Sequence, residues 1–441
     1  ASPCLTLALM RQMIPTHFDL QGRVCGFHAC LPPVTLPMPR QPIGLWLIGA
    51  KGGVATTVMT GLASLVGGRT PPVGLVTALE PFAGLDLVGF DEIVVGGHDI
   101  RPGELAEAAG LMWSESRAIP PELIEAAVDF HRAAVGRLRP GTLVAAGGKI
   151  RELADEAAAA VVESPREAIR RIRDDLEAFA TAHSLRHVVV VNVASTEPPL
   201  AEALPESFAD IEPLLDDPSS CPLPTSSLYA AAAFQAGCSY VNFTPSTGGT
   251  PTALQRLADD CGVPQAGCDG KTGETLLKSV LAPMFAARHL EVMSWVGHNI
   301  FGNLDGKVLD DPRNKASKVR SKDHLLGEIL GYPPQSHVSI EFIESLGDWK
   351  TAWDHIHFRG FLGTPMTLQF TWQGCDSILA APLVIDLARL IERAHRGGER
   401  GTLAWPACFF KSPLGVDEPR FSQQHAMLLA WAAKLTGSRG E

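Results

Sequence analysis

Lysine side chains that could act on a small anion lie between Gly267 and Lys350, within the segments GCDGKTGETLLKS, ASKVRSKD and LGDWK. Lys318 and Lys322 are four residues apart, so on a helix both ammonium groups would project from the same face. Such a pair indicates an anion between the two groups. A desolvated lysine can lose its proton near neutral pH, and a charged one can stabilise a developing enolate or alkoxide.

The segment GHNIFGNLDG adds short polar side chains to the same region. Asn299, Asn303 and Asp305 lie among glycines and carry groups suited to hydrogen-bonding sugar hydroxyls. A solvated loop is the alternative explanation for each cluster taken alone, but several clusters in one segment favour a functional site. No HExxH pattern supports a catalytic zinc, so no metal site is predicted.

A glycine-rich loop, GAKGG, follows a short apolar run and precedes a stretch with helical spacing. Gly49, Gly52 and Gly53 would let the backbone approach a pyrophosphate at the amino end of that helix, which indicates a dinucleotide site. Glycines also occur at any tight turn between a strand and a helix, so the loop alone leaves both interpretations open. An ATPase is disfavoured, because Ala55 and Thr56 follow Val54 where a phosphate-binding loop requires its Gly-Lys pair.

Strands and helices alternate around this loop, which predicts a doubly wound α/β sheet. The expected strands are 45–48, 73–79, 187–193, 239–246 and 263–266. The expected helices are 54–68, 227–237 and 252–261, with a long helical insertion over 120–182.

After residue 267 the pattern changes to strands at 291–296, 337–343 and 366–372, which predicts an α+β unit. The amphipathic segment 377–393 would then return to the first domain. The expected division is therefore an N-terminal arm over 1–40, a nucleotide-binding domain over 41–266, a catalytic and oligomerisation domain over 267–374 and a returning segment over 375–441.

The composition is that of a globular enzyme. The chain has 441 residues and a net charge of −11, so its overall field opposes binding to nucleic acid or to an anionic membrane. The nine cysteines show no CxxC pairs and fit reduced thiols. No signal peptide or membrane span is recognisable, and we expect a cytoplasmic protein.

Taken in order, these segments resemble the myo-inositol-1-phosphate synthase family from about Gly44 to Lys411. GAKGGVATT stands at the family's cofactor loop, DEIVVGGHDI resembles DLVFGGWDI, and NVASTEPP is similar to the TANTE stretch. GCDGKTGE resembles GDDFKSGQ, HNIFGNLDG resembles NHLGNNDG, and ASKVRSKD resembles RSKEISKS. LGDWK, QGCDSILAAP and FFKSP complete the series in the same order.

The resemblance implies a Rossmann domain with an inserted catalytic α+β domain, NAD as cofactor, a hexose phosphate as substrate and a homotetramer. By position it implies the catalytic residues Asp269, Lys318, Lys322, Asp348, Lys350 and Lys411. It implies substrate contacts at Thr272, Glu274, Asn299, Phe301, Asn303 and Asp305. The implied cofactor contacts are Gly49, Gly52, Gly53, Val54, Ala55, Asp99, Ala194, Ser195, Thr244, Asp376 and Ser377.

The implied reaction oxidises glucose 6-phosphate, enolises the ketone, closes the ring by an aldol step and reduces the product again. Lys318 would move the proton at the oxidised hydroxyl, Lys350 and Lys411 would stabilise oxyanions, and Lys322 would hold phosphate or share that role. The chain departs from the family at Thr272, Glu274 and Phe301, where Ser, Gln and Leu are usual.

These departures leave open a relative that closes fructose 6-phosphate to a cyclopentane. The cofactor loop departs as well, since Val54 and Ala55 stand where the family has paired asparagines. From other classes of function, an NAD-dependent dehydrogenase with net redox turnover and a noncatalytic binding protein remain as alternatives.

Overall fold

The computed structural model describes residues 40–198, 200, 203–303 and 325–437. The chain divides into residues 1–40 and residues 41–441, and the second unit contains two sheets. Among the described residues no helix is long and apolar enough to cross a membrane.

The first sheet has seven parallel strands in the order β11-β6-β5-β4-β1-β2-β3. This is the Rossmann order, in which β1 and β4 lie side by side inside the sheet and the strand order runs outward from them in both directions. The strands are β1 (Ile43–Ile48), β2 (Ile93–Asp99), β3 (Leu138–Pro140), β4 (Val188–Asn192), β5 (Ser239–Asn242), β6 (Pro264–Gly267) and β11 (Gly401–Thr402). The expected doubly wound fold is confirmed.

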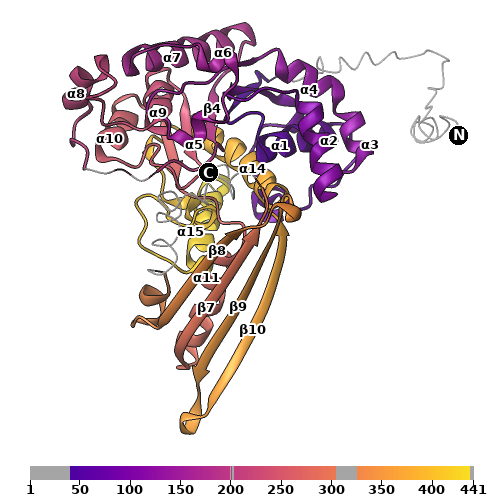
Figure 1. Ribbon diagram of the computed structural model, residues 1–441, viewed down its shortest axis with the longest axis vertical. Coiled ribbons are helices and arrows are strands. Elements are labelled where there is room, and N and C mark those ends of the chain that lie inside the picture. The colour runs from indigo at the N-terminus through magenta and orange to yellow at the C-terminus, as the bar shows by residue number, and fades with distance from the viewer. Residues whose placement is uncertain (1–39, 199, 201–202, 304–324, 438–441) are drawn as a thin grey trace, which may run out of the picture. The chain divides into compact units, whose positions relative to one another are not determined.

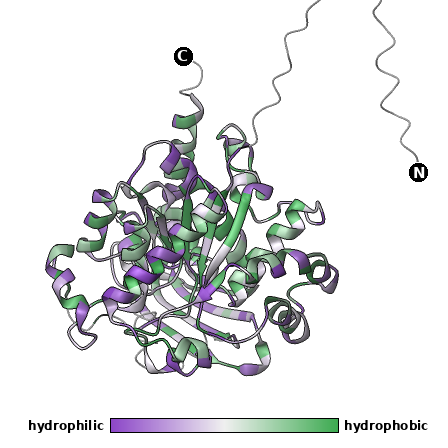
Figure 2. Ribbon diagram, turned by 90° about the horizontal axis from the view of Figure 1, so that it is seen from above, coloured by the Kyte–Doolittle hydropathy of each residue, from purple (hydrophilic) through white to green (hydrophobic). Residues whose placement is uncertain are grey.

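Both faces of this sheet are buried, and the side chains of β1 alternate between them. Leu45 and Leu47 pack in the core that α1 and α14 contribute to, whereas Trp46 and Ile48 pack in the core formed with α7 and α9. In Figure 2 the hydrophobic colour is concentrated on the strands inside the molecule, and hydrophilic patches lie on the surrounding helices. Burial on two faces explains why these strands read as continuous apolar runs.

Helices connect the strands of the first sheet (Figure 1). They are α1 (Gly53–Val66), α2 (Leu105–Ser116), α3 (Pro121–Ala126), α4 (Val128–Val135), α5 (Gly148–Arg151), α6 (Glu156–Ala159), α7 (Pro165–Ala182), α8 (Phe208–Ile211), α9 (Thr225–Gln235) and α10 (Thr252–Asp260). The expected helical insertion is confirmed in large part, although it also contains β3.

The second sheet has four strands in the order β10-β9-β7-β8 and mixes parallel with antiparallel pairs. Its strands are β7 (Glu291–Phe301), β8 (Gln335–Phe342), β9 (Trp349–Arg359) and β10 (Pro365–Cys375), and α11 (Glu274–Ala287) precedes them. Phe285 of α11 packs with Trp295 and Ile356 in a separate core. The sequence did not reveal β9.

The C-terminal segment rejoins the first sheet. β10 continues directly into α14 (Asp376–Arg396), which packs on α1, and β11 then pairs with β6. The last helix is α15 (Phe421–Gly437), and short 3₁₀ helices occupy 76–78, 80–82, 90–92, 212–216, 344–346, 361–363 and 405–409. This return places the start of α14 beside the glycine loop.

The strand expected over 73–79 is wrong, because this segment forms the 3₁₀ turn Val76–Ala78. The backbone N–H groups of Val76 and Thr77 donate to the carboxylate of Asp386, at 2.5 and 3.2 Å. A backbone N–H group that donates to a side chain of α14 cannot also donate to a neighbouring β-strand. The second strand begins instead at Ile93.

Candidate active site

A cavity of about 770 Å³ opens at the carboxyl ends of β1, β4 and β5. Ligands of doubly wound folds bind at this edge, where the strand order reverses direction. The wall combines the loop after β1, the loops after β4 and β5, and the start of α14. Segments more than 300 residues apart in the chain therefore meet around one space.

The backbone of the glycine loop lies very close to neighbouring segments. Gly49 has φ of +84°, and a Cβ on it would lie 2.8 Å from the Cα of Ala194, at the end of β4. A Cβ on Gly53 would lie 2.7 Å from Oγ of Ser377. Because only glycine fits both places, the loop leaves the amino end of α1 open to the cavity, where its N–H groups favour a phosphate.

The predicted cofactor residues lie together with one exception. Gly49, Gly52, Gly53, Val54, Asp99, Ala194, Ser195, Thr244, Asp376 and Ser377 all line the cavity. Ala55 does not, because it is fully buried in the first turn of α1 and packs in the core. The helical period turns its side chain away from the ligand side.

Asp99 ends β2 beside the glycine loop and is held by backbone donors. Its Oδ2 accepts the N–H of Lys51 at 2.6 Å, and its Oδ1 accepts the N–H of Arg101 at 2.8 Å. An acidic side chain at this position of a Rossmann fold faces the adenosine ribose.

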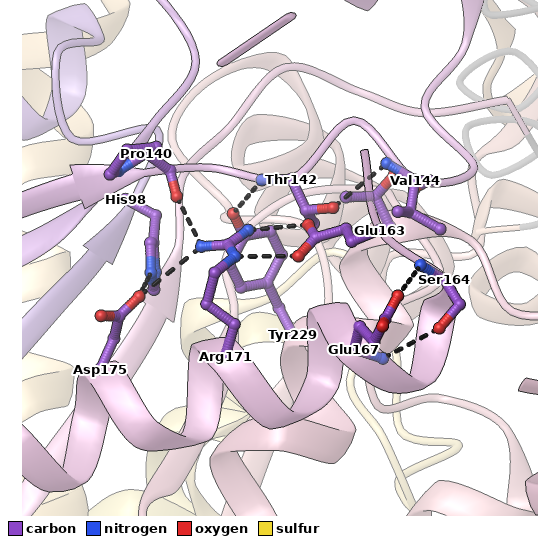
Figure 3. Close-up of polar contacts among 11 residues, drawn as sticks. His98, Pro140, Thr142, Val144, Glu163, Ser164, Glu167, Arg171, Asp175 and Tyr229 are labelled. Carbon is purple, nitrogen blue, oxygen red and sulfur yellow. Dashed lines mark hydrogen bonds and ion pairs between the residues drawn. The ribbon is translucent and has the colours of Figure 1, made fainter. Parts of the chain in front are cut away.

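A buried polar network fixes the strand end before Asp99 (Figure 3). Nδ1 of His98 accepts the indole N–H of Trp46 at 2.8 Å, so its other ring nitrogen carries the proton and donates to Asp175 at 3.1 Å. Burial lowers the pKa of His98, which keeps the ring neutral. Arg171 then joins Asp175 to Glu163 and to the carbonyl of Pro140 at the end of β3.

Two lysine–aspartate pairs occupy the other end of the cavity. Nζ of Lys411 lies 2.8 Å from Oδ1 of Asp269, and the backbone N–H of Lys411 also donates to the carbonyl of Asp269. Nζ of Lys350 lies 3.8 Å from Oδ2 of Asp376 and 5.2 Å from the centre of the Phe301 ring. All four charged side chains line the cavity, which thus holds two ammonium groups near the start of α14.

Asp348 joins β9 to α14. Its carboxylate accepts hydrogen bonds from the Cys375 thiol, from the backbone N–H of Ser377 and from the Ser377 hydroxyl, at 2.9 to 3.0 Å. Burial raises the pKa of Asp348 despite these donors. The Asp348 carboxylate accepts a hydrogen bond from the Ser377 hydroxyl. This hydrogen bond sets the orientation of the Ser377 side chain beside Gly53.

The predicted substrate residues divide into two groups. Thr272 and Asn303 line the cavity. Phe301 and Asn299 are buried in the second sheet, at 3% and 0% exposure, and do not form its wall. Glu274 does not line the cavity either, because its carboxylate forms a buried ion pair at 2.7 Å with Lys278, one helical turn away.

Asp305, Lys318 and Lys322 lie outside the described residues, and their roles stay predictions from the sequence. The wall also contains residues that were not predicted, among them Lys51, Arg101 and Ser116. Ser116 accepts the backbone N–H of Asp348 at 2.8 Å and so ties the end of α2 to the start of β9. Lys51 and Arg101 could have been noticed as basic residues within the glycine loop and directly after β2.

The fold and the cavity together define an NAD-binding protein of the Rossmann type, because the glycine cradle, the helix terminus and the acidic end of β2 fit a dinucleotide. An NAD-binding family model described as myo-inositol-1-phosphate synthase matches residues 76–432. The inositol-3-phosphate synthase 1 of Bacteroides thetaiotaomicron is 31% identical over an alignment of 423 residues that covers 88% of this chain and 93% of that protein.

Two solved structures support the same fold. An inositol-3-phosphate synthase from Caenorhabditis elegans matches with a TM-score of 0.79 and 24% identity, covering 90% of this chain and 86% of that one. A myo-inositol-1-phosphate synthase-related protein from Thermotoga maritima matches with a TM-score of 0.71 and 24% identity, covering 89% and 98%. The chain belongs to the myo-inositol-1-phosphate synthase family, and it is an NAD-binding enzyme of the isomerase class.

Proposed function

We propose that this enzyme converts glucose 6-phosphate to an inositol phosphate by an intramolecular cyclisation with no net oxidation. The observation that carries the proposal is the pair of ammonium groups, Lys350 and Lys411, on the wall of the cavity that the glycine loop also lines. A simple dehydrogenase needs to stabilise one oxyanion, whereas enolisation followed by aldol closure develops negative charge on more than one oxygen.

When bound, NAD⁺ supplies reversible hydride transfer, which makes a ketone from one substrate hydroxyl and later restores it. Lys350 and Lys411 would stabilise the charge that develops on oxygen while the carbon–carbon bond forms. Asp376 and Asp269 orient these ammonium groups before the substrate enters. Such preorganised charges act strongly where water is excluded.

Asp348 would act as a positioning residue rather than a catalytic one. It holds Ser377, whose hydroxyl oxygen lies against Gly53 of the glycine loop. We infer that Ser377 and Asp376 orient the nicotinamide end of the cofactor, while Thr272 and Asn303 bind substrate hydroxyls. The proton transfer assigned to Lys318 and the anion contact assigned to Lys322 rest on the segment ASKVRSKD.

The fructose 6-phosphate alternative gains no support from the cavity. The two substitutions that motivated it, Glu274 and Phe301, are buried away from the wall that the described residues form. Among the departures in the substrate-binding segments, Thr272 is the one that lines the cavity. Glucose 6-phosphate is therefore the substrate that we propose.

The decisive experiment incubates the protein and NAD⁺ separately with glucose 6-phosphate and with fructose 6-phosphate, and identifies the products by NMR. We expect a six-membered cyclitol phosphate from glucose 6-phosphate and no steady growth of the reduced nicotinamide absorbance. Net accumulation of NADH would indicate a dehydrogenase instead. A five-membered product from fructose 6-phosphate would support the variant reaction, and no product from either sugar would support a noncatalytic protein.

We also propose that the enzyme works in the cytoplasm as a homotetramer assembled through the second sheet. Support comes from the family resemblance and from the unpaired state of the described cysteines. Light scattering of the purified protein would measure the assembly, and a monomeric mass would contradict it.

A further inference from the structure

Both carboxylate oxygens of Asp99 are engaged by the protein itself. Besides the backbone N–H groups of Lys51 and Arg101, the Nε–H of Arg101 lies 3.4 Å from Oδ1 of Asp99. The Asp99 side chain keeps only 3% exposure. An acidic residue at this place usually accepts the ribose 2′-hydroxyl of NAD. Here most of that acceptor capacity is already used.

Two cations accompany this single carboxylate. Nζ of Lys51 donates to the backbone carbonyl of Arg101 at 2.8 Å, so the ammonium group lies beside the chain that leaves β2. The guanidinium of Arg101 reaches the glycine loop, since its Nη2 is 3.7 Å from the place where a Cβ on Gly52 would stand. Lys51, Asp99 and Arg101 all line the cavity, and their charges leave a local excess of one positive unit.

The donors of Arg101 are only partly used. Its backbone N–H and Nε bind Asp99, whereas over residues 40–198, 200, 203–303 and 325–437 no hydrogen bond involves its two terminal nitrogens. Its side chain is 21% exposed. A guanidinium anchored through Nε beside Asp99 therefore presents a planar pair of donors at the cavity wall, the geometry suited to a phosphate.

We propose that Arg101, with Lys51, forms a recess for a phosphomonoester on the ribose 2′-oxygen, so that the enzyme binds NADP as well as NAD. The amino end of α1 serves the pyrophosphate, which leaves the cations at the end of β2 for the ribose substituent. Asp99 does not repel the added phosphate, because Arg101 and Lys51 outweigh its charge. This inference rests on the dinucleotide binding of the family and not on the proposed sugar substrate.

The test uses two fragments that differ by one group, 5′-AMP and 2′,5′-ADP, together with NAD⁺ and NADP⁺. Calorimetry would measure their dissociation constants for the wild type, for Arg101→Ser and for the control Arg139→Ser. Arg139 has 48% exposure, lies outside the cavity wall and loses the same charge on substitution. Thermal melts would establish that each variant is folded.

We expect the wild type to bind 2′,5′-ADP at least about tenfold more tightly than 5′-AMP, as a charge-assisted hydrogen-bond pair allows. Arg101→Ser should abolish that preference and weaken NADP⁺ about tenfold or more, with less than about threefold change for NAD⁺. Arg139→Ser should leave both ratios unchanged. If Arg101→Ser does not fold, Arg101→Lys keeps the charge without the planar fork and should lower the preference in part.

Three results would overturn the proposal. The first is a wild type that binds 5′-AMP as tightly as 2′,5′-ADP. The second is an equal loss of both fragments in Arg101→Ser, which would place the guanidinium on the 5′-phosphate or the pyrophosphate. The third is the same selective loss in Arg139→Ser. None of these measurements involves turnover, so failure of the proposed cyclisation would leave them unaffected.

Discussion

The ion pair between Lys411 and Asp269 allows catalysis to be separated from stability by a double substitution. The two side chains keep 17% and 9% exposure, and their charged atoms are 2.8 Å apart. Lys411→Met removes the ammonium and leaves a carboxylate without this partner. Breaking a fully buried pair costs about 3–5 kcal/mol, and partial exposure reduces this to about 2–3 kcal/mol.

The matched partner change is Asp269→Asn. Asp269 has φ of +63°, a left-handed conformation that asparagine adopts more readily than most residues, so the backbone should be retained. In the double variant both side chains are neutral. We expect its free energy of unfolding to lie within about 1 kcal/mol of the wild type, because no charge is left unpaired.

Thermal unfolding would measure these differences. A chain of 441 residues has an unfolding entropy of about 0.9 kcal/mol/K, so Lys411→Met should lower Tm by about 2–3 °C. The double variant should recover most of that loss. Turnover of glucose 6-phosphate should fall by about 10²–10³ in both variants that lack the ammonium, as for the removal of one oxyanion donor.

Two results would refute this reasoning. Near wild-type turnover by the double variant would mean that the Lys411 ammonium does not stabilise the reaction. Losses of stability that simply add in the double variant would mean that the two charges are not coupled in the folded protein. Asp269→Asn alone keeps the ammonium and should lose less activity than either other variant.

Two further predictions concern pH and the glycine loop. Burial lowers the pKa of His187 to about 3 in the folded protein, whereas in the unfolded chain it is near 6.5. Below pH 6.5 the unfolded chain therefore binds a proton that the folded protein does not, and the free energy of unfolding decreases as the pH falls. Between pH 7 and 5 the loss in the free energy of unfolding amounts to about 2 kcal/mol. His187→Phe should remove this part of the pH dependence, measured by urea unfolding at each pH, and an unchanged pH dependence would contradict the prediction. Gly49→Ala should weaken NAD⁺ binding about tenfold or more, because the added Cβ would meet the backbone of Ala194. The control Gly61→Ala should not, because its Cβ would meet nothing within 4 Å. Equal NAD⁺ affinities of the two variants would argue against the close approach of Gly49 to Ala194.

The sequence alone determined the α/β class of the fold and the family. Apolar runs buried on two faces, helical spacing and the glycine loop are local patterns, because each depends on neighbouring residues and on the backbone freedom of glycine. The lysines at 350 and 411 could be assigned through short motifs whose order is maintained. The segment 73–79 shows the limit, since its β-branched residues suggested a strand while Asp386 of a distant helix bound its backbone.

Only the tertiary structure decided which polar side chains face the cavity. Glu274 and Thr272 are two residues apart, yet Thr272 lines the cavity and Glu274 pairs with Lys278 in the interior. Asp348 donates its backbone N–H to Ser116 and accepts the hydroxyl of Ser377, and these hydrogen bonds likewise join segments that no local pattern connects. The direction of a side chain depends on how remote segments pack around it, and that packing is a property of the whole fold rather than of any short stretch of sequence.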